Sequence, residues 1–310
     1  MSNTLKVIDM VAKEALRVAH EKSTFLGTVD RSYDDSYAKT GAKIGSTLRV
    51  RDPNQYTRRQ GSRVMDVQDQ NESTQIITVA TQDGVDMRFN SAELTLDTDN
   101  PGAVDLFSKR YIEPAMAVLI SGIDGDCLQT ATKNVYNVVG TPGTVVGASS
   151  DITALGNARA RLNQGLAPKD MNRALQIDSI TMASIVNGNK ALFTPEGQVK
   201  KAFTEGFYAR SAMADFYENE RTYTHTVGSD VTVSTSASAA VTDGGTNITM
   251  NSTDGNINAG DVFTVAGVYA CHPETKQSLG YLQQFVATAA STGAVTVSPA
   301  TVLTGAKQNV

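Results

Sequence analysis

The amino-acid sequence predicts an α+β fold, because helical and strand-like patterns mix along the chain without the regular alternation of a doubly wound sheet. Three observations favour this class. A long helical pattern covers residues 105–136, β-branched alternating runs precede it, and the composition changes near residue 231. With 310 residues the chain can bury a sizeable core, in one large domain or two to three small ones.

The chain begins with an amphipathic helical pattern, in which charged residues fill the face opposite the apolar one. The apolar residues recur at spacings of three and four: Leu5, Ile8, Ala12, Ala15, Leu16 and Ala19. Two interpretations stay open. The helix packs on its own domain, or it is an N-terminal arm that docks on another subunit or an assembly partner.

The segment from Arg51 to Glu72, called the arm below, has the pattern of neither a core strand nor a helix. Strand-like runs at 47–51 and 75–81 bracket it. Structureless loops this long are uncommon and usually functional or disordered. Folded as a hairpin, each limb of about 11 residues would reach about 36 Å, beyond the radius of gyration of about 20 Å of a compact chain of this length. Since such a hairpin is marginal alone, we expect it to rest on a neighbour.

Charges between residues 58 and 72 of the arm divide by sign, with three arginines before three acids. We predict that they form an inter-subunit interface: Arg58, Arg59, Arg63, Asp66, Asp69 and Glu72. Exposed ion pairs contribute about 0–1 kcal/mol each, so these charges would set register and partner choice more than strength. The other interpretation is a solvated, mobile loop.

The pattern over residues 105–136 predicts the longest helix. Pro114 cannot lie mid-helix without a kink, so we expect it to open the main helix at its first turn, with a short helix before it. A helix of about 22 residues is about 33 Å long, enough for a structural strut. One apolar stripe follows its length: Met116, Leu119, Ile123, Cys127, Ala131 and Val135.

Further along, the patterns predict helices at 151–166 and 195–208 and strands at 91–96 and 175–182. Residues 231–310 carry only six of the chain's 27 basic and 32 acidic residues. Short strand patterns separated by glycine turns lie at 246–250, 262–265, 282–287 and 294–297, which predicts a small antiparallel barrel or sandwich. We expect Phe263, Tyr269, Tyr281 and Phe285 to form its core and the domain to fold autonomously.

Signals for catalysis or metal binding are weak. Cys271 and His272 are adjacent, but no second pair lies at a metal-site spacing, and no nucleophile elbow, Walker loop or dinucleotide fingerprint occurs. Asp124 and Asp126 share a helix two residues apart, so we expect them to be solvated. The sequence therefore predicts no catalytic, cofactor-binding or metal-ligating residues, and a protein that is not an enzyme.

Composition points to a soluble protein made in a reducing cytoplasm. Two cysteines give no disulfide framework, and no apolar run approaches the roughly 18 residues of a membrane span. The net charge of −5 shows no footprint for tight nucleic-acid binding.

Several runs resemble the major capsid (coat) proteins of P-twenty-two-like short-tailed bacteriophages. The most specific is GTVDRSYDDSYAKTGAKIGSTLRVRDPNQYT, residues 27–57. The others are QIITVATQDGV (75–85), SAELTL (91–96), FSKRYIEPAMAVL (107–119), FYENERTYTHTVG (216–228), GDVFTVAGV (260–268) and QQFVATAA (283–290).

The resemblance implies the Hong Kong ninety-seven type capsid fold. It assigns residues 1–28 to an N-terminal arm, 29–75 to the extended-loop region, 76–150 to a peripheral domain with a spine helix, 151–230 to an axial domain, 231–303 to a β-rich insertion domain and 304–310 to the start of a return segment. Family members continue past this point, so the resemblance implies that the family's C-terminal strands are absent at Val310.

The function that the resemblance implies is self-assembly into an icosahedral shell, through a procapsid built in the host bacterial cytoplasm. The expected partners are copies of the chain in hexamers and pentamers, a scaffolding protein and a portal protein. The shell would enclose double-stranded DNA without sequence-specific binding. Two alternatives remain: a shell of the same fold that encloses protein cargo, and a hydrolase or sugar-binding protein with an accessory β domain.

Overall fold

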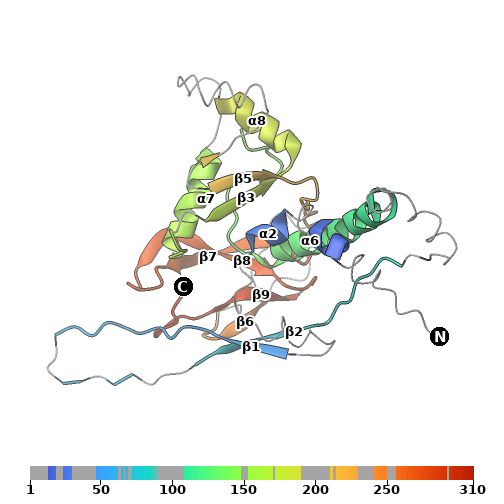
Figure 1. Ribbon diagram of the computed structural model, residues 1–310. Helices are drawn as coiled ribbons and strands as arrows, with labels where there is room; N and C mark the ends of the chain where they lie inside the picture. The colour runs from blue at the N-terminus through green and yellow to red at the C-terminus, as the bar shows by residue number, and fades with distance from the viewer. Residues whose placement is uncertain are drawn as a thin grey trace, which may run out of the picture. The chain divides into compact units, whose positions relative to one another are not determined.

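The computed structural model (Figure 1) divides the chain into two compact units, Met1–Val50 with Thr74–Leu128, and Arg51–Ser73 with Gln129–Val310. It describes residues 13–18, 24–29, 47–61, 64–65, 67–68, 72–86, 88, 108–147, 153–169, 172–189, 210–211, 214–229, 241–249, 256–291 and 293–310. The predicted strand at 91–96 and the predicted helix at 195–208 lie outside these residues.

The main element of the first unit is the long helix α6 (Glu113–Asn134), whose last turns belong to the second unit. A single π-helical turn, η1 (Ser108–Ile112), precedes it. Pro114 lies in the first turn of α6, where its missing N–H costs no intrahelical hydrogen bond. The predicted helix, its opening at Pro114 and the short helical turn before it are therefore confirmed.

The buried face of α6 is centred one residue away from the predicted stripe. Ile120, Asp124 and Leu128, four residues apart, are the buried side chains of the helix. The predicted stripe from Met116 to Ala131 is half-buried, and it ends on an exposed Val135. Apolar residues occur on several faces of α6. The sequence pattern did not identify the buried face because a carboxylate, that of Asp124, lies in the middle of it.

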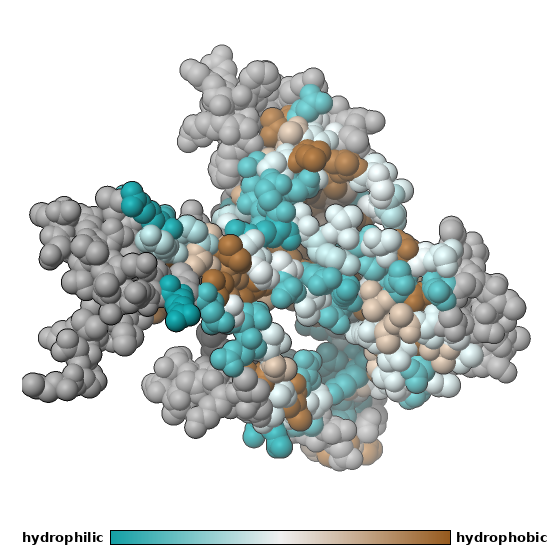
Figure 2. Space-filling model, turned by 90° about the vertical axis from the view of Figure 1, so that its right-hand side faces the viewer, coloured by the Kyte–Doolittle hydropathy of each residue, from teal (hydrophilic) through white to brown (hydrophobic). Residues whose placement is uncertain are grey.

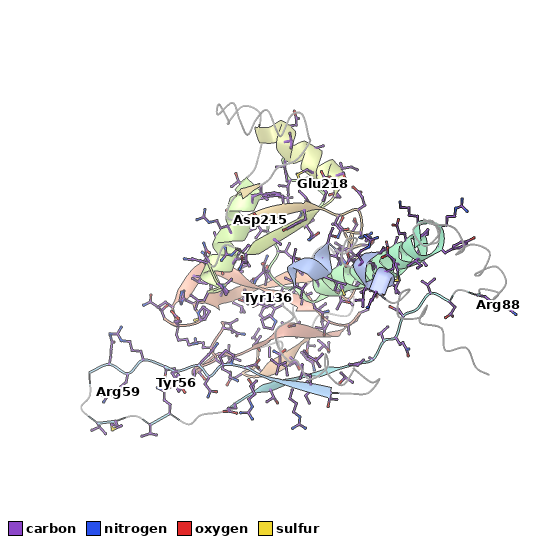
Figure 3. All side chains as sticks on the ribbon, viewed as in Figure 1. Tyr56, Arg59, Arg88, Tyr136, Asp215 and Glu218 are labelled. Carbon is purple, nitrogen blue, oxygen red and sulfur yellow. The ribbon has the colours of Figure 1, made fainter. Side chains whose placement is uncertain are left out.

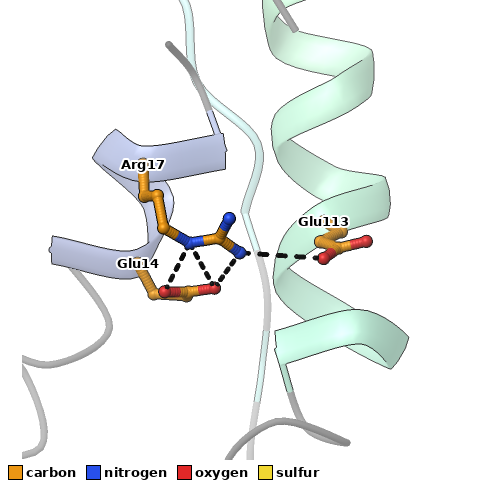
Figure 4. Close-up of polar contacts among 3 residues, drawn as sticks. All are labelled: Glu14, Arg17 and Glu113. Carbon is orange, nitrogen blue, oxygen red and sulfur yellow. Dashed lines mark hydrogen bonds and ion pairs between the residues drawn. The ribbon is translucent and has the colours of Figure 1, made fainter. Parts of the chain in front are cut away.

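Residues 13–18 are helical and contact their own chain. Arg17 bonds Glu14 through its Nη2 at 2.6 Å, and the same nitrogen lies 4.0 Å from Oε1 of Glu113 at the start of α6 (Figure 4). Val18 is 1% exposed whereas Leu16 is 61% exposed, so the predicted apolar stripe was wrong at Leu16. These contacts favour the interpretation that this part of the helix packs on its own domain.

In the second unit, a three-stranded sheet has the order β3-β5-β4. The strand β3 (Arg173–Ile177) runs parallel to β5 (Ala214–Glu218), and β4 (Arg210–Ser211) runs antiparallel to β5. Helices α7 (Thr153–Gln164) and α8 (Ser179–Asn189) lie beside this sheet (Figure 1). They share one apolar core with it: Met182, Ile185 and Phe216, with Val146, Leu155, Leu175 and Ile177 packed against them.

The predicted strand at 175–182 was wrong in its second half, because β3 ends at Ile177 and α8 begins at Ser179. Asp178 is the reason. Its Oδ2 accepts a hydrogen bond from the Thr181 backbone N–H at 3.3 Å, the arrangement of an N-cap. The hydrogen bond with the Thr181 side chain lowers the pKa of Asp178 below its usual value. The β-branched residues Ile180 and Thr181, which follow the cap, are typical of strands, so the sequence pattern predicted that the strand continues.

Residues 241–310, called the β domain below, contain a four-stranded antiparallel sheet of order β6-β9-β8-β7. Its strands are β6 (Gly245–Thr249), β7 (Val262–Cys271), β8 (Ser278–Ala287) and β9 (Ala294–Thr301). All four predicted strands are confirmed, and β7, β8 and β9 extend beyond the predicted ranges because their polar and glycine positions broke the sequence pattern.

The β domain has its own apolar core. Phe285 is fully buried, and its ring centroid lies 6.2 Å from that of Phe263. Tyr269 is exposed, which corrects its predicted place in the core, because β7 is an edge strand whose register shifts on both sides of this residue. The buried members are Ile248, Ile257, Phe285, Ala287, Val295 and Val297.

Residues 302–310 fold back onto the β domain. The Asn309 side chain accepts a hydrogen bond from Val302 N at 2.9 Å and donates one to Ala300 O at 2.7 Å, while its backbone O accepts from Cys271 N at 3.1 Å. Val310 packs against the core around Phe285. The end of this chain therefore contributes to the β domain.

We predict that residues 231–310, expressed alone, fold into a stable domain, because every member of the apolar core lies within them. The measurement is a two-dimensional amide NMR spectrum, which should be dispersed. A matched segment that ends at residue 303 lacks Asn309 and Val310 and should unfold at a lower denaturant concentration. A collapsed spectrum for the longer segment would show that the domain depends on the rest of the chain.

Candidate functional site

The arm continues a two-stranded sheet formed by β1 (Thr47–Arg51) and β2 (Thr74–Thr78). At its base, Asp52 N donates to Ser73 O at 3.0 Å, and the Ser73 hydroxyl donates to Asp52 Oδ2 at 2.9 Å. Lys307, from the end of the chain, donates to the Ser73 hydroxyl at 2.9 Å. The base of the arm is therefore held by side chains as well as by the backbone.

Farther along the arm, Gln68 joins the two limbs. Its Oε1 accepts a hydrogen bond from Thr57 N at 2.9 Å, and its Nε2 donates to Thr57 O at 2.7 Å. The amide thus bonds both backbone groups of Thr57, as a neighbouring strand would. Closer to the tip, Arg59 Nη1 donates to Val64 O, and Gly61 adopts a φ of +85° that suits glycine.

Large apolar side chains of the arm are exposed to solvent. Val64, Met65 and Val67 are 76%, 81% and 80% exposed, and Tyr56, labelled in Figure 3, is more than half exposed. No arm residue that the structure describes is buried. Because full burial of such a side chain is worth about 1.5–3 kcal/mol, covering this set would supply more free energy than the surface charges of the arm.

Exposed apolar residues also occur elsewhere. On the face drawn in Figure 2 they lie in several separate groups among polar residues. Single exposed apolar side chains are normal on protein surfaces. The arm differs because its described residues expose four of them on two thin limbs with no core beneath.

The structure places three of the six predicted interface residues. Arg58 and Arg59 are exposed on the outgoing limb. Glu72 pairs with Arg51 across the base at 3.6 Å, with both side chains more than half exposed, so it has a partner within the chain. Arg63, Asp66 and Asp69 lie outside the described residues. The sequence interpretation emphasised charge and gave no weight to the exposed apolar residues near the turn of the arm, Val64, Met65 and Val67, called the apolar tip below.

A second group that sequence reasoning missed surrounds Asp261, at the turn before β7. His225 Nε2 lies 2.6 Å from its Oδ1, and both side chains are largely buried. The two residues are far apart in sequence and belong to no motif, although the Gly260-Asp261 turn was a local signal. His272, by contrast, accepts hydrogen bonds at Nδ1 from the backbone of Glu274 and Thr275 and caps a turn.

Asp124, predicted to be solvated, is fully buried on α6, which corrects that prediction. Its Oδ2 accepts weak hydrogen bonds from the backbone N and hydroxyl of Thr24, at 3.4 and 3.5 Å, next to helix α2 (Phe25–Thr28). Asp126 is exposed, as predicted. Burial, with the Asp124 and Asp126 carboxylates, raises the pKa of the Cys127 thiol, which keeps it in the less reactive protonated form.

Among the described residues, no three His, Cys, Asp or Glu side chains gather where they could hold a metal ion. In the same part of the chain, no helix combines the length and the apolar character that a membrane crossing requires. Comparison with protein-family models and with curated protein sequences found no match to this chain.

We predict that Gln68→Ala loosens the arm without unfolding the molecule, because it removes two hydrogen bonds worth about 0.5–1.5 kcal/mol each. Amide hydrogen exchange at Thr57 should accelerate by about tenfold. Gln60→Ala, an exposed change on the same arm, is the control and should leave Thr57 unchanged. Equal exchange in both variants would mean that the Gln68 amide does not hold the limbs together.

Proposed function

We propose that this chain is a major capsid protein, a non-catalytic subunit that self-assembles into the icosahedral shell of a tailed double-stranded DNA bacteriophage. The observation that carries the proposal is the arm, a two-limbed extension whose exposed apolar side chains have no core of their own. The resemblance of residues 27–57 and the later runs to phage coat proteins supports the same conclusion.

The proposed fold is the Hong Kong ninety-seven type. Within it, α6 would be the spine helix, the sheet β3-β5-β4 with α7 and α8 would belong to the axial domain, and the β domain would be the insertion domain. The proposed partners are other copies of the chain, a scaffolding protein and a portal protein, and the proposed location is the virion capsid.

Assembly would proceed by each arm lying on the next subunit, head to tail. Contacts of this heterologous kind form rings when the rotation closes. In this scheme the apolar tip supplies most of the free energy of each contact, since covering Met65 and Val67 is worth about 2 kcal/mol each. Arg58 and Arg59 would guide register and the rate of association, because exposed charges act mainly in this way.

We predict that the expressed protein, with its scaffolding partner, forms closed particles visible by negative-stain electron microscopy. Met65→Ser with Val67→Ser should abolish or strongly reduce them, because the tip loses its apolar contact area. Ile180→Ser, which changes a 75% exposed apolar residue on α8, is the control and should assemble normally. An elongated monomer that never forms particles would refute the proposal.

We also predict that Arg58→Glu slows assembly or changes particle size, with an effect that weakens as salt is raised. Arg88→Glu, an exposed arginine outside the arm, is the matched control. Arg59→Glu is a less clean test because it also removes the hydrogen bond to Val64 O. Unchanged yield and size for Arg58→Glu and Arg59→Glu together would show that the charges of the arm do not guide assembly.

A further inference from the structure

Polar contacts join the β domain to the segments around it. Gln284 on β8 accepts a hydrogen bond from Val138 N at 3.1 Å and donates to Val138 O at 2.9 Å. The guanidinium carbon of Arg161 on α7 lies 3.4 Å from the ring centroid of Tyr281. Since the residues of the apolar core all come from the domain itself, breaking such contacts would leave that core covered.

The most buried of these contacts centres on Asp261, whose side chain is about one-tenth exposed. Oδ1 accepts from His225 Nε2 at 2.6 Å, and Oδ2 accepts from Gly228 N at 3.0 Å and from Asn258 N at 2.7 Å. One carboxylate therefore bonds two donors of the preceding segment, residues 222–229, and one donor of its own domain. Hydrogen bonds to a charged group are among the stronger ones in proteins.

Asp261 is itself fixed to the β domain through its backbone. Ala287 N donates to Asp261 O at 2.9 Å, and Gly260 N donates to Ala287 O at 2.7 Å, so the turn is tied to the end of β8. Asn258 adds a bond from its Nδ2 to Thr226 O at 3.3 Å. The segment 222–229 is thus bonded to a turn that is itself tied to β8 by two backbone hydrogen bonds.

Two glycines permit this close approach. A Cβ at Gly260, where φ is +102°, would lie 3.0 Å from both His225 Cε1 and Lys133 Cγ. A Cβ at Gly228 would lie 2.1 Å from Asn256 O, a distance that no side chain tolerates. The backbone is therefore shaped to bring Asp261, His225 and the end of α6 together.

The cluster extends to α6 through Tyr223. Lys133 Nζ lies 5.4 Å from the Tyr223 ring centroid, within the range of a cation–π contact, and that ring lies 6.3 Å from His225. Nδ1 of His225 is buried, with no hydrogen-bond partner among the described residues, and lies on the side of Gly260. The cluster thus joins three segments of the chain: the turn at Gly260 and Asp261, residues 222–229, and the last turn of α6.

We propose that Asp261 and His225 form a latch that holds the β domain against residues 222–229 and the C-terminal end of α6. Opening of the latch would let the β domain move as a folded body, because its core is its own. The latch belongs to the single chain and is independent of the proposed assembly.

The test is amide hydrogen exchange, followed by mass spectrometry, on the full chain and on Asp261→Asn. The amide that replaces the carboxylate directs an N–H group at donors, so exchange in residues 222–229 should rise about tenfold or more, while the strands β7, β8 and β9 keep their protection. Asp243→Asn is the matched control, because Asp243 accepts a backbone bond from Leu303 at 2.8 Å within the β domain. The Asp243→Asn variant should leave the rate of amide hydrogen exchange in residues 222–229 unchanged.

His225→Phe is the second variant, since it keeps a ring in place and removes only the donor to Asp261. In this variant, amide exchange should also rise in residues 222–229 and not in β7, β8 and β9, although by a smaller factor. If Asp261→Asn does not fold, the exchange of His225→Phe by itself tests the latch. Unchanged exchange in residues 222–229 in the folded variants would overturn the latch. An equal rise across β7, β8 and β9 would also overturn it, because Asp261 would then stabilise only the fold of the domain.

Discussion

The structure depends on apolar burial that is divided among small cores. Phe285 anchors the core of the β domain, Phe216 anchors the core between the sheet β3-β5-β4 and its helices, and Ile120 and Leu128 are buried on α6. The described contacts between the β domain and the segments around it lie outside these cores, and they are largely polar and directional. The hydrogen bonds of Asp261 and Gln284 join the β domain to these segments, whereas its apolar core is built from its own residues.

The arm differs from these parts because its described residues form no apolar core. Its limbs are joined by the Gln68 amide and the pairs at its base, and none of its described residues is buried. Beyond these hydrogen bonds, such a segment gains further stability where its apolar side chains are covered. This is why the arm supports a proposal of assembly, and why the tip around Met65 matters more to its strength than the arginines beside it.

Sequence reasoning succeeded where local chemistry is decisive. Pro114 marked the start of α6, and the glycine turns of the β domain located all four of its strands. It failed where an interior contact reverses the local preference. Asp178 turned a predicted strand into the helix α8, and Asp124 lies buried on a face that a carboxylate normally avoids. For the candidate interface, the sequence identified the charged residues but not the importance of the apolar tip, because residue type alone does not show which apolar side chains are exposed.

By itself, the sequence determined where the helix at residues 13–18, the helices α6 and α7 and most of the described strands lie, because helix periodicity, proline and glycine act through the nearest few residues. It also singled out residues 51–72 as an arm, since no apolar period allows them a core. Only the tertiary structure decided that Asp261 meets His225 and that Gln68 clamps Thr57. Those partners are separated along the chain, and a hydrogen bond between them exists only when folding brings donor and acceptor within about 3 Å.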